Sequence, residues 1–222
     1  MTARRWCVVA GLGLLVGVGA SATDAHQGFG AGNRPWVRVL SILLNVATAW
    51  VLAAFVAGRV AQTWGQAVAD GSMSLYVAVV GYYVYGVTLG DRIDVGLSAL
   101  TGVTGYWLLV ATVAGPVFGV LGRATHLPGV AGTLAALSVP GVAAGEVVGR
   151  LRISRDGFQS DPLREWTCAA LLLTAMACAA WTLARAAAPA VSVALNARPS
   201  TSRAQGIPPG ARHDDAPGRH RP

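Results

Sequence analysis

Six long apolar stretches run through this chain, and each is close to the length that a lipid bilayer demands of a helix. They are residues 6–22, 39–57, 73–89, 99–121, 129–148 and 166–183, joined by short connections that carry arginine. A hydrocarbon core about 30 Å thick needs about 20 mostly apolar residues at the helical rise. The stretches lack the polar–apolar alternation of barrel strands, so helices are the remaining way to satisfy their backbone in lipid. The sequence therefore predicts an all-α, polytopic transmembrane helix bundle of about six spans.

The composition excludes an ordinary soluble domain. Of the 222 residues, 54% are hydrophobic and 12% charged, with a mean hydropathy of +0.52. The net charge of +7 is the balance of 17 basic residues, all of them arginine, against 10 acidic ones. The arginines lie at the ends of the apolar stretches and in the C-terminal region. Membrane proteins keep basic residues there, so we expect a lipid bilayer around the chain and no nucleic-acid partner.

Two regions follow from this pattern. Residues 1–187 hold all six stretches and form the predicted transmembrane domain. Residues 188–222 are rich in proline, glycine and arginine, with no apolar period toward their end. Such a segment cannot bury enough surface to offset its ordering entropy, so it is expected to be a disordered tail.

The first stretch has two readings. Arg4 and Arg5 precede it, so it is either a first span with a cytoplasmic N-terminus or a signal peptide ending at Ala20-Ser21-Ala22. Both readings place Thr23 outside the cytoplasm. Seven flanking arginines fall on each side of the predicted spans, with Arg4 and Arg5 counted among them. The count is a tie, so the expected orientation follows from the arginine pair before the first helix, which usually dominates. With six spans, both termini are then cytoplasmic.

Polar residues inside apolar stretches are costly, which makes them candidates for an intramembrane site. Glu146 is the only acidic residue within any of the six stretches, and Arg150 follows on the same helix face. The two form either an interfacial ion pair or a titratable carboxyl in a cavity that passes protons or cations. Asn45 is expected to bond to a neighbouring helix, with ligand binding as the alternative. Tyr82 and Tyr83 fall near the middle of the third stretch, where they either line a polar cavity or bond backbone carbonyls.

Glycine spacing predicts where helices touch. Gly115 and Gly119 are four residues apart, as are Gly141 and Gly145, and such small-residue ridges let backbones approach closely. All four are expected at helix–helix contacts. Pro116 and Pro140 each remove a helical hydrogen bond and are expected to kink the fourth and fifth spans.

No catalytic, cofactor-binding or metal motif stands out. The three cysteines are isolated within the stretches, and the four histidines are scattered outside them. There is no nucleophile-elbow, zinc-protease or paired-carboxylate pattern within the spans. We therefore expect neither an enzyme nor a bound metal or cofactor.

A family resemblance covers about residues 11–185. Its residues are Asn45, Trp50, Phe55 and Gly58, then Gly81-Tyr82-Tyr83, Tyr106-Trp107, Gly115-Pro116-x-x-Gly119 and Gly145-Glu146. This pattern resembles a family of small actinobacterial membrane proteins that is a domain of unknown function. The resemblance implies a six-helix bundle in a bacterial inner membrane and implies no activity.

Two function classes remain open. The first is a small-solute or ion permease, or a membrane subunit of one, that uses Glu146, Asn45 and the tyrosines around a cavity. The second is a non-catalytic scaffold or accessory protein whose glycine faces bind other transmembrane helices or a second copy of the chain. Convergence of Glu146, Asn45 and Tyr82 on one cavity would favour the first.

Overall fold

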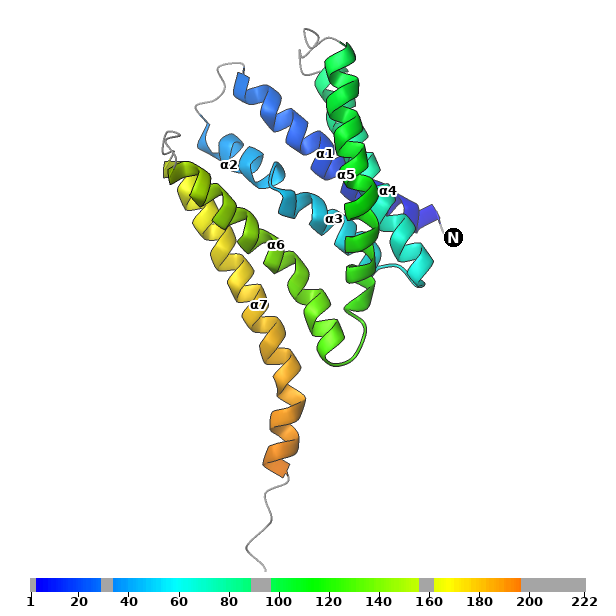
Figure 1. Cartoon of the computed structure of the whole chain (residues 1–222), viewed down its shortest axis with the longest axis vertical. Helices are drawn as coiled ribbons and strands as arrows, with labels where there is room; N and C mark the ends of the chain where they lie inside the picture. Colours follow the sequence, from blue (N-terminus) through cyan, green and yellow to red (C-terminus); the bar gives the residue numbers. More distant parts are fainter. Residues whose placement is uncertain (1–2, 29–33, 89–96, 156–161, 197–222) are drawn as a thin grey trace, which may run out of the picture. The chain divides into compact units, whose positions relative to one another are not determined.

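The computed structural model describes residues 3–28, 34–88, 97–155 and 162–196, and this part of the chain is all helical (Figure 1). Its helices are α1 (Ala3–Gly28), α2 (Pro35–Leu44), α3 (Ala47–Arg59), α4 (Trp64–Thr88), α5 (Leu97–Ala124), α6 (Val130–Arg155) and α7 (Pro162–Asn196). The all-α prediction is thereby confirmed. The chain divides into two units, residues 1–186 and 187–222. The second unit includes the last turns of α7, so the helix extends beyond the expected start of the tail at residue 188, while residues 197–222 lie outside the described residues.

Five single helices are long and apolar enough to cross a membrane. These candidate spans are Arg5–Ala25, Trp64–Thr88, Gly102–Ala124, Val130–Arg150 and Glu165–Ala186. A sixth candidate consists of α2 and α3 together, which are bent by 58° at the residues between them. The stretch expected to be one continuous span over 39–57 is therefore broken inside its length.

The packing of α1 on α4 shows how the broken pair must run. The two helices are in parallel register: the backbone of Gly13 meets Ser74, that of Gly17 meets Ala78, and Gly81 meets Val18 farther along. If α2 and α3 entered and left a bilayer on the same side, α4 would return antiparallel to α1. In a bilayer that α1 and α4 both cross, this parallel packing corresponds to α2 and α3 crossing together as the sixth candidate span.

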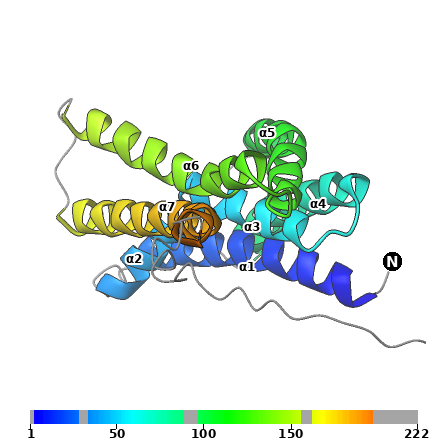
Figure 2. The ribbon, with the colours of Figure 1, turned by 90° about the horizontal axis from the view of Figure 1, so that it is seen from below.

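Glycines bring α3, α4 and α5 into backbone contact. A Cβ added to Gly119 would lie 2.2 Å from the Ala67 carbonyl oxygen, and one added to Gly115 would lie 2.6 Å from Ser72 Cα. A Cβ on Gly58 would lie 2.0 Å from the carbonyl oxygen of Gly119. These separations leave no room for any side chain, and Figure 2 shows α4 and α5 lying side by side. The close-packed group is α1, α3, α4 and α5.

Helix α6 does not share this contact. No atom lies within 4 Å of a Cβ placed on Gly141 or on Gly145, so the expected helix–helix contact at these two glycines is not present among the described residues. The reason is that α6 approaches α3 through polar side chains instead of a glycine ridge. Pro116 and Pro140 lie inside α5 and α6, which continue through them, and the break in the fold occurs at Asn45–Val46.

Candidate functional site

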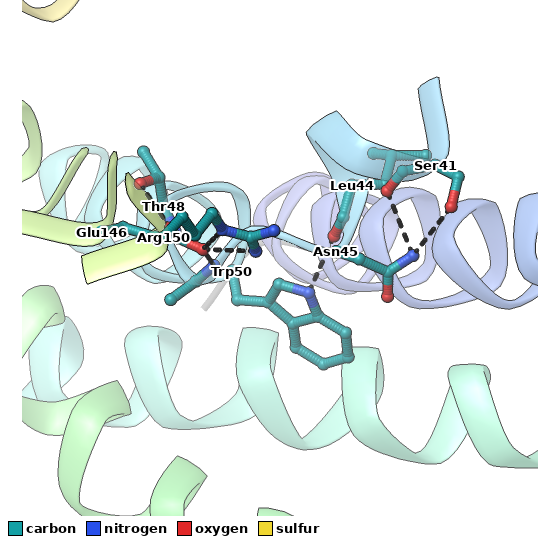
Figure 3. Close-up of polar contacts among 8 residues, drawn as sticks. Ser41, Leu44, Asn45, Thr48, Trp50, Glu146 and Arg150 are labelled. Carbon is teal, nitrogen blue, oxygen red and sulfur yellow. Dashed lines mark hydrogen bonds and ion pairs between the residues drawn. The ribbon is translucent and has the colours of Figure 1, made fainter. Parts of the chain in front are cut away.

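The site is built around the break between α2 and α3. Asn45 ends α2: its backbone N–H donates to the Ser41 carbonyl at 2.9 Å, and its side-chain Nδ2 donates to the same oxygen at 3.1 Å (Figure 3). The Trp50 indole N–H reaches back to the Leu44 carbonyl at 2.9 Å. A broken helix in an apolar region frees carbonyls that need donors. Here side chains next to the break supply them.

The N-terminus of α3 is capped by a side chain from a different span. Val46 precedes the helix and offers no side-chain cap. The Glu146 carboxylate on α6 accepts from the backbone N–H of Ala47 and from that of Thr48, each at 3.1 Å, and from the Thr48 hydroxyl at 3.1 Å. A carboxylate at this end also meets the positive pole of the helix dipole. Glu146 therefore fixes α6 to the break.

Arg150 completes this cluster. Its Nη2 and Nε donate to Glu146 Oε1 at 2.8 and 3.2 Å, one helical turn along α6. The pair expected from the sequence is present, and it lies against the break in α2–α3 (Figure 3). The Glu146 side chain keeps 15% of its surface exposed and Arg150 keeps 25%.

A second carboxylate lies on the other side of the break. Asp24, near the end of α1, accepts from the Ser41 hydroxyl at 2.9 Å and from Asn45 Nδ2 at 2.8 Å. Its other oxygen accepts from the Tyr82 hydroxyl at 2.8 Å. Asn45 thus makes the interhelical hydrogen bond expected of it, and Asp24 is the partner.

The polar residues converge on a cavity of about 670 Å³ between α3, α4, α5 and α6. Its lining is mainly apolar, from Leu75, Val79, Val110, Ala111 and Ala114 among others. Glu146, Asn45, Tyr82 and Tyr83, the four candidates from the sequence, all line it, together with Arg150. The aromatic rings of Trp50 and Tyr82 lie 6.2 Å apart and those of Tyr82 and Tyr83 lie 5.2 Å apart. The arrangement can enclose a small solute against ring faces, with charged groups beside the helix break.

Sequence reasoning missed the acidic residues at both ends of the α1–α4 packing. Asp24 and Asp70 lie in candidate spans of α1 and α4, so the expectation that Glu146 is the only acidic residue within a span is wrong. Asp70 is 1% exposed, and its Oδ2 pairs with the Arg5 guanidinium, with Nε at 2.7 Å. Hydropathy alone made the third stretch begin at Met73, because the polar residues before Met73 lower the local mean hydropathy. The signal that could have included Asp70 is the compensating Arg5 on a neighbouring span.

The described part of the chain contains no cluster of metal-binding side chains. No group of three or more His, Cys, Asp or Glu side chains there could hold an ion. The cysteines described by the structure are free thiols, with Cys168 buried and Cys7 and Cys178 exposed.

Comparison with known proteins places the chain at the family level. Neither the curated proteins nor the solved structures give a match. One family pattern does match, and it covers residues 1–208, nearly the whole sequence. The expected relation to a domain of unknown function is confirmed: the chain belongs to a family of unknown function, DUF6518.

Proposed function

We propose that this protein is a permease for small solutes, or the membrane subunit of one, rather than an enzyme. The observation that carries the proposal is the cavity of about 670 Å³ at the break between α2 and α3. Broken helices, with freed backbone groups and half-helix ends, are the features from which transporters build binding sites within the membrane. The volume falls within the range of about 300–1,000 Å³ typical of small-molecule pockets.

The arrangement of close and loose contacts supports the same proposal. The helices α1, α3, α4 and α5 meet through glycine backbones, whereas α6 is attached to α3 by the Glu146 hydrogen bonds. Hydrogen bonds between α6 and α3 can be replaced by others without repacking a core. The close-packed glycine contacts cannot separate without repacking the helices that they join. We therefore assign α6 as the side of the cavity that opens. The proposed location is a bacterial inner membrane, with both termini cytoplasmic.

Water access to the cavity tests the proposal. In a chain with Cys7, Cys168 and Cys178 replaced, Ala114→Cys puts a thiol on the cavity wall, and Val113→Cys puts one on the same helix at a residue 64% exposed and outside the cavity lining. A permeation path must admit water, whereas a face toward lipid excludes it. A charged, membrane-impermeant thiol reagent should label Ala114→Cys from at least one side of the membrane and leave Val113→Cys unlabelled. Failure to label Ala114→Cys from either side, in protein shown to be folded, would refute the permease.

The scaffold alternative has one observation in its favour. Gly141 and Gly145 on α6 have open space where a Cβ would stand, so a small-residue face remains there without a neighbour among the described residues. Such a face suits a second copy of the chain or another membrane protein. With Cys7, Cys168 and Cys178 replaced, disulfide cross-linking of Gly145→Cys in native membranes would yield dimers if the partner is a second copy, and monomers if no second copy lies against this face.

A further inference from the structure

We infer that the cavity selects a small solute that carries one negative charge on an apolar or aromatic body. This inference rests on the proposed function, because it concerns the same cavity. Among the described residues that line the cavity, Arg150 supplies the positive charge and Glu146 the negative charge. The selection follows from how much hydrogen-bonding capacity each of the two has left.

Arg150 has donors to spare. Its Nε and Nη2 both donate to the same oxygen of Glu146, while Nη1 donates to no described residue. A guanidinium carries five N–H donors in a fixed planar fork and matches carboxylates in pairs. With a quarter of its side-chain surface exposed, Arg150 can offer the remaining donors to a solute in the cavity.

Glu146 has no acceptors to spare. Oε1 accepts from the Ala47 amide and twice from Arg150, and Oε2 accepts from the Thr48 amide and hydroxyl. A carboxylate has about four lone-pair sites, so these bonds fill it. The amides at the start of α3 also bring the positive end of a helix dipole to the carboxylate. The pair therefore presents unused donors and no unused charged acceptor, which favours an anion over a cation.

The cavity walls suit an apolar body. The Trp50 N–H is engaged by the Leu44 carbonyl and the Tyr82 hydroxyl by Asp24, so both residues present ring surface to the cavity with their polar ends occupied elsewhere. Val79 and Ala111, each 2% exposed, continue the apolar wall. An inorganic anion would leave these walls without a partner, and a neutral apolar solute would leave the unused N–H donors of Arg150 without one.

Three probes of one shape and different charge test the inference: benzoate, benzamide and benzylamine. We would measure their binding to the purified full-length protein in lipid nanodiscs by equilibrium dialysis at fixed ionic strength. Because hydrogen bonds to charged groups are stronger than neutral ones, benzoate should bind about tenfold more tightly than benzamide. Benzylamine should bind more weakly than both.

The variants assign the effect to Arg150. Arg150→Gln should lower benzoate binding to the level of benzamide while benzamide binding is retained, and Arg150→Lys should keep part of the preference because the charge remains. Arg152→Gln removes one exposed arginine from the same helix, outside the cavity lining, and should behave as the natural protein does.

Benzoate binding no tighter than benzamide binding, including no binding by either, would overturn the inference. A benzoate preference that survives in Arg150→Gln would overturn the role of Arg150. Neither result bears on the permease itself, which stands or falls with the labelling of Ala114→Cys.

Discussion

The carboxylate of Glu146 on α6 accepts a hydrogen bond of 3.1 Å from the backbone amide of Thr48 in the first turn of α3. The two residues are 98 positions apart in sequence. The first amides of a helix have no acceptor within that helix, and here a side chain from another helix accepts from two of them. The break between α2 and α3 and the position of α6 therefore depend on the same hydrogen bonds.

Loss of this cap should destabilise the protein measurably. Glu146→Gln removes the charge that faces both the start of α3 and Arg150, and we expect the free energy of unfolding to fall by about 1–2 kcal/mol, as for other helix caps. Thr48→Val removes the hydroxyl bond and keeps the backbone amide, so its effect should be smaller. Equilibrium unfolding in mixed detergent micelles measures both. Equal stability of Glu146→Gln and the natural protein would show that the cap contributes nothing.

A matched pair of glycine substitutions should separate close-packed from open positions. In Gly119→Ala the new methyl group would meet the Ala67 carbonyl oxygen, so we expect a loss of about 1–3 kcal/mol from overpacking. Gly145→Ala adds a methyl group where nothing lies within 4 Å, and alanine favours a helix by up to about 1 kcal/mol over glycine. Thermal unfolding in detergent should therefore rank Gly145→Ala at or above the natural protein. The reverse order would contradict the described packing.

The buried pair of Arg5 and Asp70 should be sensitive to loss of one partner. Asp70→Asn leaves the Arg5 charge without its carboxylate at a site where Asp70 is 1% exposed, and breaking such pairs typically costs about 3–5 kcal/mol. The double change Arg5→Met with Asp70→Leu removes both charges and should recover most of the stability. Denaturant unfolding of the single and double variants gives the coupling energy. A double variant as unstable as Asp70→Asn would mean that lost packing, not the unpaired charge, sets the cost.

The broken span can be tested by topology. Arg123 at the end of α5 donates to the Ala61 carbonyl at 2.7 Å, so the α3–α4 and α5–α6 connections lie at the same end of the bundle. Cysteines placed singly at Gln62 and Leu127, in a cysteine-free chain, should be labelled from the same side of the membrane. A cysteine at Gly30 should be labelled from the opposite side. Labelling of Gly30 and Gln62 from one side would show that α2 and α3 enter and leave the membrane on the same side.

The sequence was sufficient for the helical class because helix length and hydropathy are local properties. The same holds for Gly115 and Gly119, whose spacing predicts a close contact that α4 does provide. Gly141 and Gly145 have identical spacing and no such neighbour, so spacing describes a surface suited to contact and does not identify its partner.

The break at Asn45 could not be predicted, because its cause is spread over four helices. Neither proline produces it. Asn45 is held by Ser41 on its own helix and by Asp24 on α1, while the new helix start depends on Glu146 from α6. Each of these interactions is weak evidence alone. The candidate site was nevertheless found in part, since Glu146, Asn45 and the two tyrosines are polar residues in apolar surroundings.

Under the anion-binding proposal, the cap at α3 links occupancy of the cavity to the stability of the helix. Glu146 holds the first amides of α3 with the same carboxylate that holds Arg150. An anion that draws Arg150 toward itself changes the partners of that carboxylate, and with them the stability of the first turn of α3. Linkage is reciprocal: the coupling free energy that an anion at Arg150 imposes on the start of α3 is the same one that a change acting only on the capped state imposes on the affinity for the anion.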